Sequence, residues 1–435
     1  MDVSFSTPDV TCLAQGAVFS TDPAVTGINS NEIAVGGTGA GKTVSIAGPR
    51  LAHARDKSQV VVLTKRKLFT MFKGSLEKKG YDVDVIDLVK PECSTVGYDP
   101  LKHVRTEDEV VNLADALSMF GKDRKDGSKD PFWPMMGRKA LECLMNLEIE
   151  NAKADKREHA MKNVFKLFNN LKWKARGGCS INETTLDPLF DELEKIKPGN
   201  SASAEWNGIF TGNADNTAGC IKAETAAMLH EIKCENILKI MEMDEQIDFS
   251  TFDQHKRALF IITSSTKTVY NNFLNLFYTQ MFDELITLAE NKENQRLDIP
   301  VHFIADDFAC GAPIKNFPEL ISVFRASGIS ATLLLQSESQ LAAIYGENDA
   351  KTIINNCDTY VYMGGNDLKT IESISERANK PVITIASLPL GQVYVFRRGS
   401  KPYCGERYRI FEDPLYKEIA EEYEQKTCRS NTLVP

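Results

Sequence analysis

The sequence predicts an α/β fold with a mainly parallel sheet and an inserted helical domain, and three observations support this prediction. A short apolar run, Ile33–Val35, leads into the glycine-rich stretch Gly36–Thr43, and a helical pattern follows it. Elsewhere short β-branched runs alternate with amphipathic segments, which is the pattern of a doubly wound sheet. Between residues 104 and 245, by contrast, helical patterns follow one another and strand-like runs are scarce.

Composition indicates a soluble globular protein. The 435 residues leave room for two or three domains, and 42% hydrophobic with 26% charged residues is ordinary for that class. The longest apolar runs are too short to cross a membrane, and the N-terminus lacks a signal-peptide pattern. Ten cysteines are scattered without a Cys-x-x-Cys pair, which argues against zinc and disulfide frameworks and fits a reducing cytosol. With a net charge of −9, contact with DNA requires a locally basic feature.

The first part of the α/β domain, residues 1–103, is expected to alternate strands and helices. Residues 1–30 are polar and predict a lead-in arm packed on this domain. The helix after the glycine-rich stretch is expected from Lys42 to Arg55, with a kink at Pro49, because proline lacks the N–H that a helix needs. Strands are expected at Val60–Leu63 and Val83–Leu88, with a helix at Lys65–Lys79 between them.

The inserted all-α domain is expected over residues 104–245. Its charged stretch Gly121–Asp130 predicts a mobile loop whose lysines form a solvated surface rather than a DNA site. Helices are expected at Thr106–Met119, Phe132–Glu150, His159–Leu171, Leu186–Lys195, Cys220–His230 and Glu235–Glu242.

The second part of the α/β domain is expected over residues 246–412, and an acidic, helical C-terminal tail over residues 413–435. Strands are expected at Ala258–Thr263, Val301–Ala305, Ile329–Leu335, Tyr360–Met363 and, as the last strand, Gln392–Phe396. The accompanying helices are expected at Thr268–Glu290, Lys315–Ala326, Glu338–Tyr345 and Asp367–Ala378.

The glycine-rich stretch has the Gly-x-x-x-x-Gly-Lys-Thr pattern of a phosphate-binding loop. Its backbone can curl until N–H groups point at an anion, and the start of the following helix adds positive charge. Lys42 is placed to reach the β- and γ-phosphates of ATP, and the Thr43 hydroxyl to ligate Mg²⁺. A flexible loop without a ligand would explain neither residue. The predicted binding residues are Gly36, Gly37, Thr38, Gly39, Ala40, Gly41, Lys42 and Thr43.

Two carboxylates, Asp306 and Asp307, follow the expected strand Val301–Ala305. Because the carboxyl ends of parallel strands meet at one edge of a sheet, Asp306 is expected beside the phosphate-binding loop, where it can hold the Mg²⁺. Asp307 is then placed to orient or deprotonate the attacking water. A helix N-cap or a turn is the alternative for such a pair, but the loop upstream favours hydrolysis.

Gln336 and Arg325 are further catalytic candidates. Gln336 follows the strand Ile329–Leu335 and can position the water or sense the γ-phosphate; capping the next helix together with Ser337 is the alternative. Arg325 ends the preceding helix and can act in trans on a neighbouring subunit's γ-phosphate. A cation that stabilises the helix dipole explains Arg325 equally well.

Longer blocks of the sequence carry a family resemblance. They include Thr26–Asn31, the loop itself, Gly80–Val83 with Tyr98–Pro100, Asp130–Trp133 and, most specifically, Asp306–Gly365 with its Leu-Gln-Ser and Asn-Cys-Asp motifs. In these blocks, which span most of the sequence, the chain resembles the conjugative type IV coupling proteins. These are TraG-type DNA-transfer P-loop ATPases, and the resemblance is strongest to those of Gram-positive mobile elements.

The resemblance implies a RecA-like nucleotide-binding domain with a helical domain inserted into it. Six copies would form a ring around a channel, a homo-hexamer. ATP hydrolysis with Mg²⁺ would drive single-stranded DNA and its attached relaxase towards a type IV secretion channel. The helical domain would recognise relaxase and accessory conjugation proteins. The expected location is the cytoplasmic face of the cell membrane, for a chain that is itself soluble and has no transmembrane segment.

Three features depart from the family pattern. Family members typically carry N-terminal transmembrane helices, whereas this chain starts shortly before the loop, so we expect either a trimmed chain or a membrane partner. The usual Asp-Glu pair is Asp306-Asp307, and the shorter side chain of Asp307 predicts slow hydrolysis. In place of the family's Asp-Pro-Lys-Gly stands Thr64–Lys67, a basic cluster that either begins a solvated helix or faces DNA.

Two other functions stay open at this point. The protein can be an adaptor that binds ATP, docks relaxase through residues 104–245 and barely hydrolyses. It can also be a related ring ATPase that translocates double-stranded DNA, as in chromosome partition or phage packaging. The block Asp306–Gly365 favours the single-stranded function over this second alternative.

Overall fold

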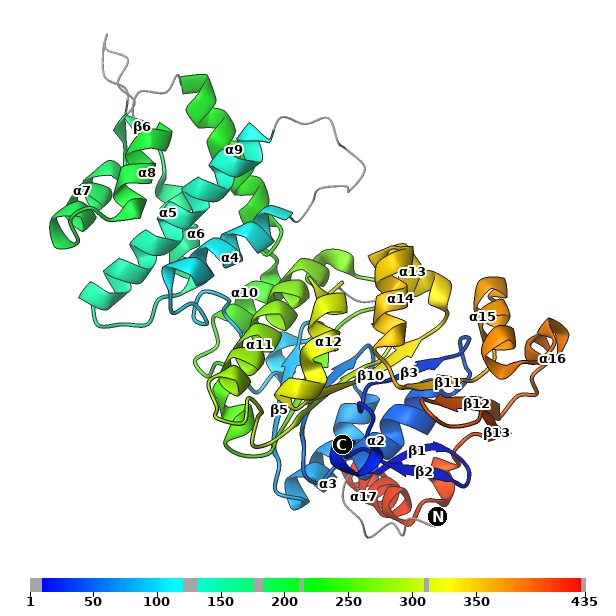
Figure 1. The fold of residues 1–435 in the computed structure, drawn as a ribbon. Coiled ribbons are helices and arrows are strands. Elements are labelled where there is room, and N and C mark those ends of the chain that lie inside the picture. Colours follow the sequence, from blue (N-terminus) through cyan, green and yellow to red (C-terminus); the bar gives the residue numbers. More distant parts are fainter. Residues whose placement is uncertain (1–9, 120–130, 175–182, 211–214, 309–312, 432–435) are drawn as a thin grey trace. The chain divides into compact units, whose positions relative to one another are not determined.

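A computed structural model describes residues 10–119, 131–174, 183–210, 215–308 and 313–431 (Figure 1). The chain divides into two compact units. The α/β unit comprises residues 1–95, 248–268 and 281–435, and the helical unit comprises residues 96–247 and 269–280. The expected mobile loop Gly121–Asp130 lies wholly outside the described residues. Among the described helices, none combines the length and the hydropathy that spanning a bilayer requires.

The α/β unit is built on one large sheet. In the described part of the chain its nine strands are ordered β13-β12-β11-β3-β10-β9-β4-β8-β5. From β11 to β5 all neighbours are parallel, while β12 and β13 extend the sheet in antiparallel fashion. In this order the strands are Tyr403–Glu406, Gln392–Arg397, Thr359–Tyr362, Glu32–Val35, Ile329–Leu335, Val301–Ala305, Ser58–Leu63, Arg257–Ile262 and Asp82–Asp87.

This sheet confirms the predicted α/β class and its mainly parallel strands. The central strands are buried over their whole length and mainly apolar, because both faces of the sheet are covered. One expectation was wrong, because Gln392–Phe396 is not the last strand: the exposed strand β13 follows it. From residue 10 on, the N-terminal segment packs on this domain as expected. Its internal structure was not predicted: β1 (Val10–Ala14) and β2 (Ala17–Ser20) form an antiparallel hairpin, and α1 (Pro23–Thr26) follows.

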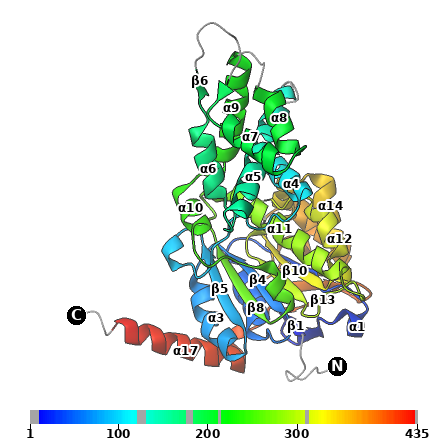
Figure 2. The same cartoon turned by 90° about the vertical axis from the view of Figure 1, so that its left-hand side faces the viewer.

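Helices cover both faces of the sheet (Figures 1 and 2). On one face α2 (Gly48–Ala52), α3 (Lys67–Lys78) and α17 (Pro414–Asn431) contact one another. On the other face lie α12 (Phe317–Ser327), α13 (Glu338–Tyr345), α14 (Glu347–Asn355) and the last part of α11 (Asn271–Glu290). A ring cluster of Phe282, Phe303 and Phe324 joins that second layer to the sheet. Helices α15 (Leu368–Ala378) and α16 (Val382–Ala386) complete the unit.

The helix after the phosphate-binding loop differs from the expected Lys42–Arg55. It begins as a π-helical turn, Thr43–Ala47, continues as α2 and ends at Ala52. Pro49 lies in the first turn of α2, where its missing N–H interrupts no α-helical hydrogen bond. The wider π-turn before it therefore replaces the expected kink. Helices α14 and α16 were not predicted, because both are short, with nine and five residues.

The helical unit contains the predicted helices, here α4 (Glu107–Met119), α5 (Phe132–Ala154), α6 (Met161–Asn170), α7 (Asp187–Ile196), α9 (Asp215–His230) and α10 (Glu235–Met241). It also contains α8 (Ser201–Phe210), which was not predicted. Two strands of two residues each, β6 (Trp173–Lys174) and β7 (Glu183–Thr184), pair in antiparallel fashion. Its core includes Trp206 stacked on Phe190, with ring centroids 4.3 Å apart. The first part of α11 belongs to this unit.

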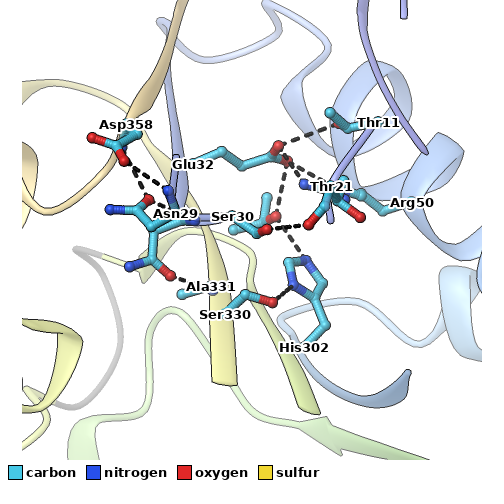
Figure 3. A network of polar contacts seen from close by, with 12 residues as sticks. Thr11, Thr21, Asn29, Ser30, Glu32, Arg50, His302, Ser330, Ala331 and Asp358 are labelled. Carbon is cyan, nitrogen blue, oxygen red and sulfur yellow. Dashed lines mark hydrogen bonds and ion pairs between the residues drawn. The ribbon is translucent and has the colours of Figure 1, made fainter. Parts of the chain in front are cut away.

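A polar network lies under the amino ends of β3, β10 and β9 (Figure 3). Buried Glu32 accepts hydrogen bonds from Arg50 of α2 (2.6 Å to Nη2) and from Thr332 (2.8 Å) and Thr11 (3.2 Å). His302 lies between Ser330 and Thr332, and burial, then nearby cations, holds its pKa well below 6.5. The network ties the N-terminal hairpin and α2 to the sheet. It lies at the edge opposite to the phosphate-binding loop, so its carboxylate and imidazole belong to the framework.

Candidate functional site

The stretch Gly36–Thr43 forms a tight loop between β3 and the helical segment. Gly39 and Gly41 have φ values of 80° and 87°, a left-handed conformation that side chains with a Cβ adopt only under strain. The Gly36 N–H donates to the carbonyl of Leu335, the last residue of β10. The Gly37 N–H donates to the carbonyl of Gly364, which follows β11. The loop is therefore anchored to β10 and to the segment after β11, and its shape is built into the sheet.

Lys42 lies against this loop and is only 7% exposed. Its Nζ donates to the carbonyl oxygens of Gly36 (2.6 Å) and Gly37 (3.3 Å). These contacts hold the ammonium group at the loop, where the sequence motif requires it for phosphate binding.

Thr43 and Asp306 meet although they are 263 residues apart in the sequence. The Thr43 Oγ1 donates to both carboxylate oxygens of Asp306, at 2.9 and 3.0 Å. Burial raises the pKa of Asp306 above 3.8, as does the charge of Asp307, while the Thr43 hydrogen bond and Lys42 oppose that rise. A hydroxyl and a carboxylate are hard oxygen ligands, so this pair fits Mg²⁺.

The described residues hold no group of three or more His, Cys, Asp or Glu side chains suited to a metal ion.

Asp307 and Gln336 lie next to this pair. Asp307 has φ 52°, an uncommon backbone conformation for a residue with a side chain. Gln336 Nε2 lies 3.4 Å from Asp307 Oδ1, and Gln336 Oε1 lies 3.4 Å from the Thr38 hydroxyl. Ser337 caps α13, with its Oγ accepting from the Gln340 N–H at 3.2 Å. The capping role considered for Gln336 thus belongs to Ser337, and Gln336 faces the loop.

The strand order explains this convergence. β10 lies between β3 and β9, so the strand that carries Asp306 is not adjacent to the strand that carries the loop. Leu335 is paired with Val35, and Leu333 with both Ile33 and Ala305. The residues that follow these three strands therefore reach the same edge, with Gln336 in the middle.

One cavity of about 440 Å³ opens beside the loop. Thr38, Lys42, Thr43, Asp306, Asp307 and Gln336 line one part of it. Leu68, Met71 and Phe72 of α3 line another part, together with Phe411 and Tyr416 from the C-terminal segment.

The basic cluster Thr64–Lys67 contributes to this cavity. Thr64, Lys65 and Lys67 line it, whereas the Arg66 Nε donates to Asp87 Oδ2 at 2.9 Å. Positive charge at this place suits an anionic ligand in the cavity. The DNA-facing role considered for the cluster stays a prediction.

Arg325 is not near the cavity. It is exposed in the last turn of α12, immediately before β10 begins. It therefore lies towards the amino edge of the sheet, opposite to the loop. A role in trans stays a prediction.

Three residues that contact this site were not predicted. The guanidinium of Arg407 donates to the carbonyl of Ala40 in the loop at 3.2 Å, and Phe411 and Tyr416 line the cavity. The sequence offers no local signal for them, because they follow the weak strand β13 and the acidic tail shows only helical character. Their position depends on how the C-terminal segment packs.

Comparisons with known proteins agree with this geometry. The family described as Type IV secretory system Conjugative DNA transfer matches residues 2–390. A search of curated proteins finds no match. Among solved structures, the bacterial conjugative coupling protein TrwBdeltaN70 in complex with sulphate is similar at 18% identity, with a TM-score of 0.62 over 87% of this chain and 85% of that chain.

Two further structures are similar. TrwB in complex with ADP and Mg²⁺ has 18% identity and a TM-score of 0.61, over 87% of this chain and 85% of that chain. VirB4 of Thermoanaerobacter pseudethanolicus has 13% identity and a TM-score of 0.54, over 95% and 98% of the two chains. These likenesses establish the RecA-like P-loop fold. Because the family match extends over nearly the whole sequence, the chain belongs to the type IV secretory system family of conjugative DNA transfer proteins.

Proposed function

We propose that this protein is the ATP-hydrolysing coupling protein of a conjugative DNA transfer system. The observation that carries the proposal is the Thr43–Asp306 contact beside Lys42, because it joins a phosphate-binding loop to a carboxylate from a distant strand. Similar structures support the choice of ligand, since TrwB is described in complexes with ADP and Mg²⁺ and with a non-hydrolysable ATP analogue.

Each residue has a defined task in this proposal. The loop N–H groups and Lys42 bind the β- and γ-phosphates, and Thr43 with Asp306 would hold Mg²⁺. When bound, Mg²⁺ would neutralise the negative charge that develops on the phosphate oxygens. Asp307 orients or deprotonates the attacking water, and Gln336, which lies between the loop and Asp307, positions that water or senses the γ-phosphate.

Family membership supports the choice of partners. We expect single-stranded DNA as the transported polymer, relaxase and accessory proteins docked on residues 104–245, and a type IV secretion channel at the membrane. A homo-hexameric ring would place Arg325 of one subunit at the interface with the next, where it can act on the neighbour's nucleotide. Residues 1–103 and 246–412 would form the ATPase core, and residues 413–435 its C-terminal extension.

The test is ATP hydrolysis by the purified full chain, measured alone, with single-stranded DNA and with double-stranded DNA. We expect stimulation by single-stranded DNA and loss of about 100-fold or more in rate for Lys42→Ala. Lys351→Ala, an exposed lysine on α14, is the matched control and keeps the rate. Tight ATP binding without turnover under any condition would identify an adaptor. Preferential stimulation by double-stranded DNA would identify a duplex translocase.

A further inference from the structure

The C-terminal segment after β13 runs directly over the phosphate-binding loop. The Arg407 N–H donates to the carbonyl of Gly391 at 2.8 Å, and its guanidinium donates to Ala40 of the loop. A Cβ on Gly41 would lie 2.6 Å from Arg407 Nη1, and one on Gly48 would lie 2.7 Å from Ile410 Cδ1. Glycine at both positions leaves the space that this close approach needs. The segment lies outside residues 2–390, which the family description covers.

A buried polar cluster fixes this segment to α2. His53, which caps α2, lies 2.7 Å from Asp413 through Nε2 and Oδ2, and the Tyr408 hydroxyl donates to the same oxygen at 2.6 Å. Burial alone would raise the pKa of Asp413, but the hydrogen bonds from His53 and Tyr408 outweigh it and lower that pKa to about 2. The Tyr416 N–H also donates to Asp413. Because the side chains of His53 and Asp413 are both buried, their contact holds the segment in a defined position beside α2.

The anchored segment presents aromatic rings to the cavity. Phe411 is 66% exposed and meets Tyr416 edge-on, with centroids 5.5 Å apart at 84°. Tyr416 in turn contacts Phe72 of α3, at 6.2 Å between centroids. An exposed phenylalanine that lines a cavity offers its ring to a ligand. The same cavity contains the charged loop residues, so it joins a phosphate-binding part to an aromatic part.

We propose that Phe411 and Tyr416 form the wall that stacks on the nucleotide base, and that Arg407 contacts the phosphates at the loop. This inference rests on one part of the proposed function, the binding of a nucleotide at the phosphate-binding loop. Stacking does not read the hydrogen-bonding edge of the base but becomes stronger with ring area, so purine nucleoside triphosphates are preferred over pyrimidine ones, with adenine and guanine accepted alike. Arg407 acts as a binding residue, because a guanidinium next to the loop carbonyl is within reach of a phosphate held by the loop.

The test is calorimetric titration of the full chain with Mg²⁺ and either a non-hydrolysable ATP analogue or inorganic tripolyphosphate, which has no base. Phe411→Ala should weaken binding of the analogue about tenfold and leave binding of tripolyphosphate unchanged. Arg407→Gln should weaken binding of both ligands. Ile383→Ala, an equally exposed apolar residue on α16, is the matched control and should change neither. In the wild type, purine nucleotides should bind more tightly than pyrimidine nucleotides, and Phe411→Ala should remove that difference.

The outcomes separate this inference from the proposed function. If the wild type binds both ligands, Lys42→Ala binds neither and Phe411→Ala binds the analogue normally, the base wall is refuted while the nucleotide site stands. Equal weakening of both ligands by Phe411→Ala would also refute it, since the ring would then act on the loop and not on the base. Unchanged tripolyphosphate binding by Arg407→Gln would refute the phosphate contact. If the wild type binds neither ligand, both proposals fail. Tripolyphosphate binding reports an intact loop and so shows that Phe411→Ala is folded, and an unchanged thermal unfolding curve shows this for Arg407→Gln and Lys42→Ala.

Discussion

At the scale of single residues, the site depends on a carboxylate that folding makes harder to ionise. Asp306 is partly buried beside Asp307, and the Thr43 hydroxyl, Lys42 and the backbone N–H of Asp307 favour its charged form without outweighing burial. Its pKa is therefore raised in the folded chain. The folded state holds the Asp306 proton more tightly than the unfolded state, so ionisation costs stability. That cost sets in as the pH rises above the ordinary value of 3.8 and is complete above the raised pKa.

Asp306→Asn should therefore separate function from stability. We expect Mg²⁺-dependent ATP hydrolysis to fall about 100-fold or more, because the metal loses its carboxylate ligand. We also expect the melting temperature at pH 7 without Mg²⁺ to stay the same or rise, because a neutral amide replaces a buried charge. Steady-state rates and thermal unfolding measure the two effects. A clear drop in melting temperature, or a normal rate, would contradict this reading of Asp306.

Asp307 provides a second test, because its side chain is one methylene shorter than the glutamate usual in the family. If it acts on the attacking water, Asp307→Asn should abolish hydrolysis and leave ATP binding intact. Asp307→Glu should raise kcat severalfold by bringing the carboxylate closer to the water. Its left-handed backbone at φ 52° tolerates glutamate less well than aspartate, so the unfolding midpoint should fall slightly. Full hydrolysis by Asp307→Asn would remove this residue from the mechanism.

At the scale of the elements, α2 is held from both ends. Near its start the loop is hydrogen-bonded to the ends of neighbouring strands, and Arg50 within the helix pairs with buried Glu32 of β3. Its last residue is followed by His53, which pairs with Asp413 of the C-terminal segment. The helix that begins at the phosphate site is thus connected to the N-terminal hairpin, to the sheet and to α17.

The Glu32–Arg50 pair should matter far more for stability than a surface pair. Arg50→Met leaves the Glu32 carboxylate buried without its cation and should lower the free energy of unfolding by about 3–5 kcal/mol. Lys73→Met, which removes one member of an exposed pair with Glu77, is the control and should cost about 0.5 kcal/mol or less. Urea unfolding measures both. Equal effects of the two variants would show that the buried network does not hold α2.

At the scale of the whole molecule, the sequence predicts those features whose physical cause leaves a local pattern of residues. The parallel strands were predictable because burial on both faces makes them mainly apolar, as in Ile329–Leu335. The grouping of Thr43, Asp306 and Gln336 was predictable because parallel strands bring their carboxyl ends to one edge.

Other parts carried no such signal. Strand β13 has the sequence YCGE and is largely exposed, so it lacks an apolar face. The hairpin of β1 and β2 is short, and its buried pattern reflects tertiary packing rather than alternation. Phe411 and Tyr416 line the cavity on a segment that Asp413 ties to His53, 360 residues away in the sequence. No local pattern records such a contact.

The central claim is that one Mg²⁺–nucleotide complex is held jointly by Thr43 and Asp306. Its most direct test is a double-mutant cycle on the Mg²⁺-induced gain in affinity for a non-hydrolysable ATP analogue, using Thr43→Ala, Asp306→Asn and the double variant. We predict that each single variant loses most of this gain and that the double variant loses little more, because both side chains serve the same ion. Additive losses, or an undiminished Mg²⁺ effect in Asp306→Asn, would contradict the account.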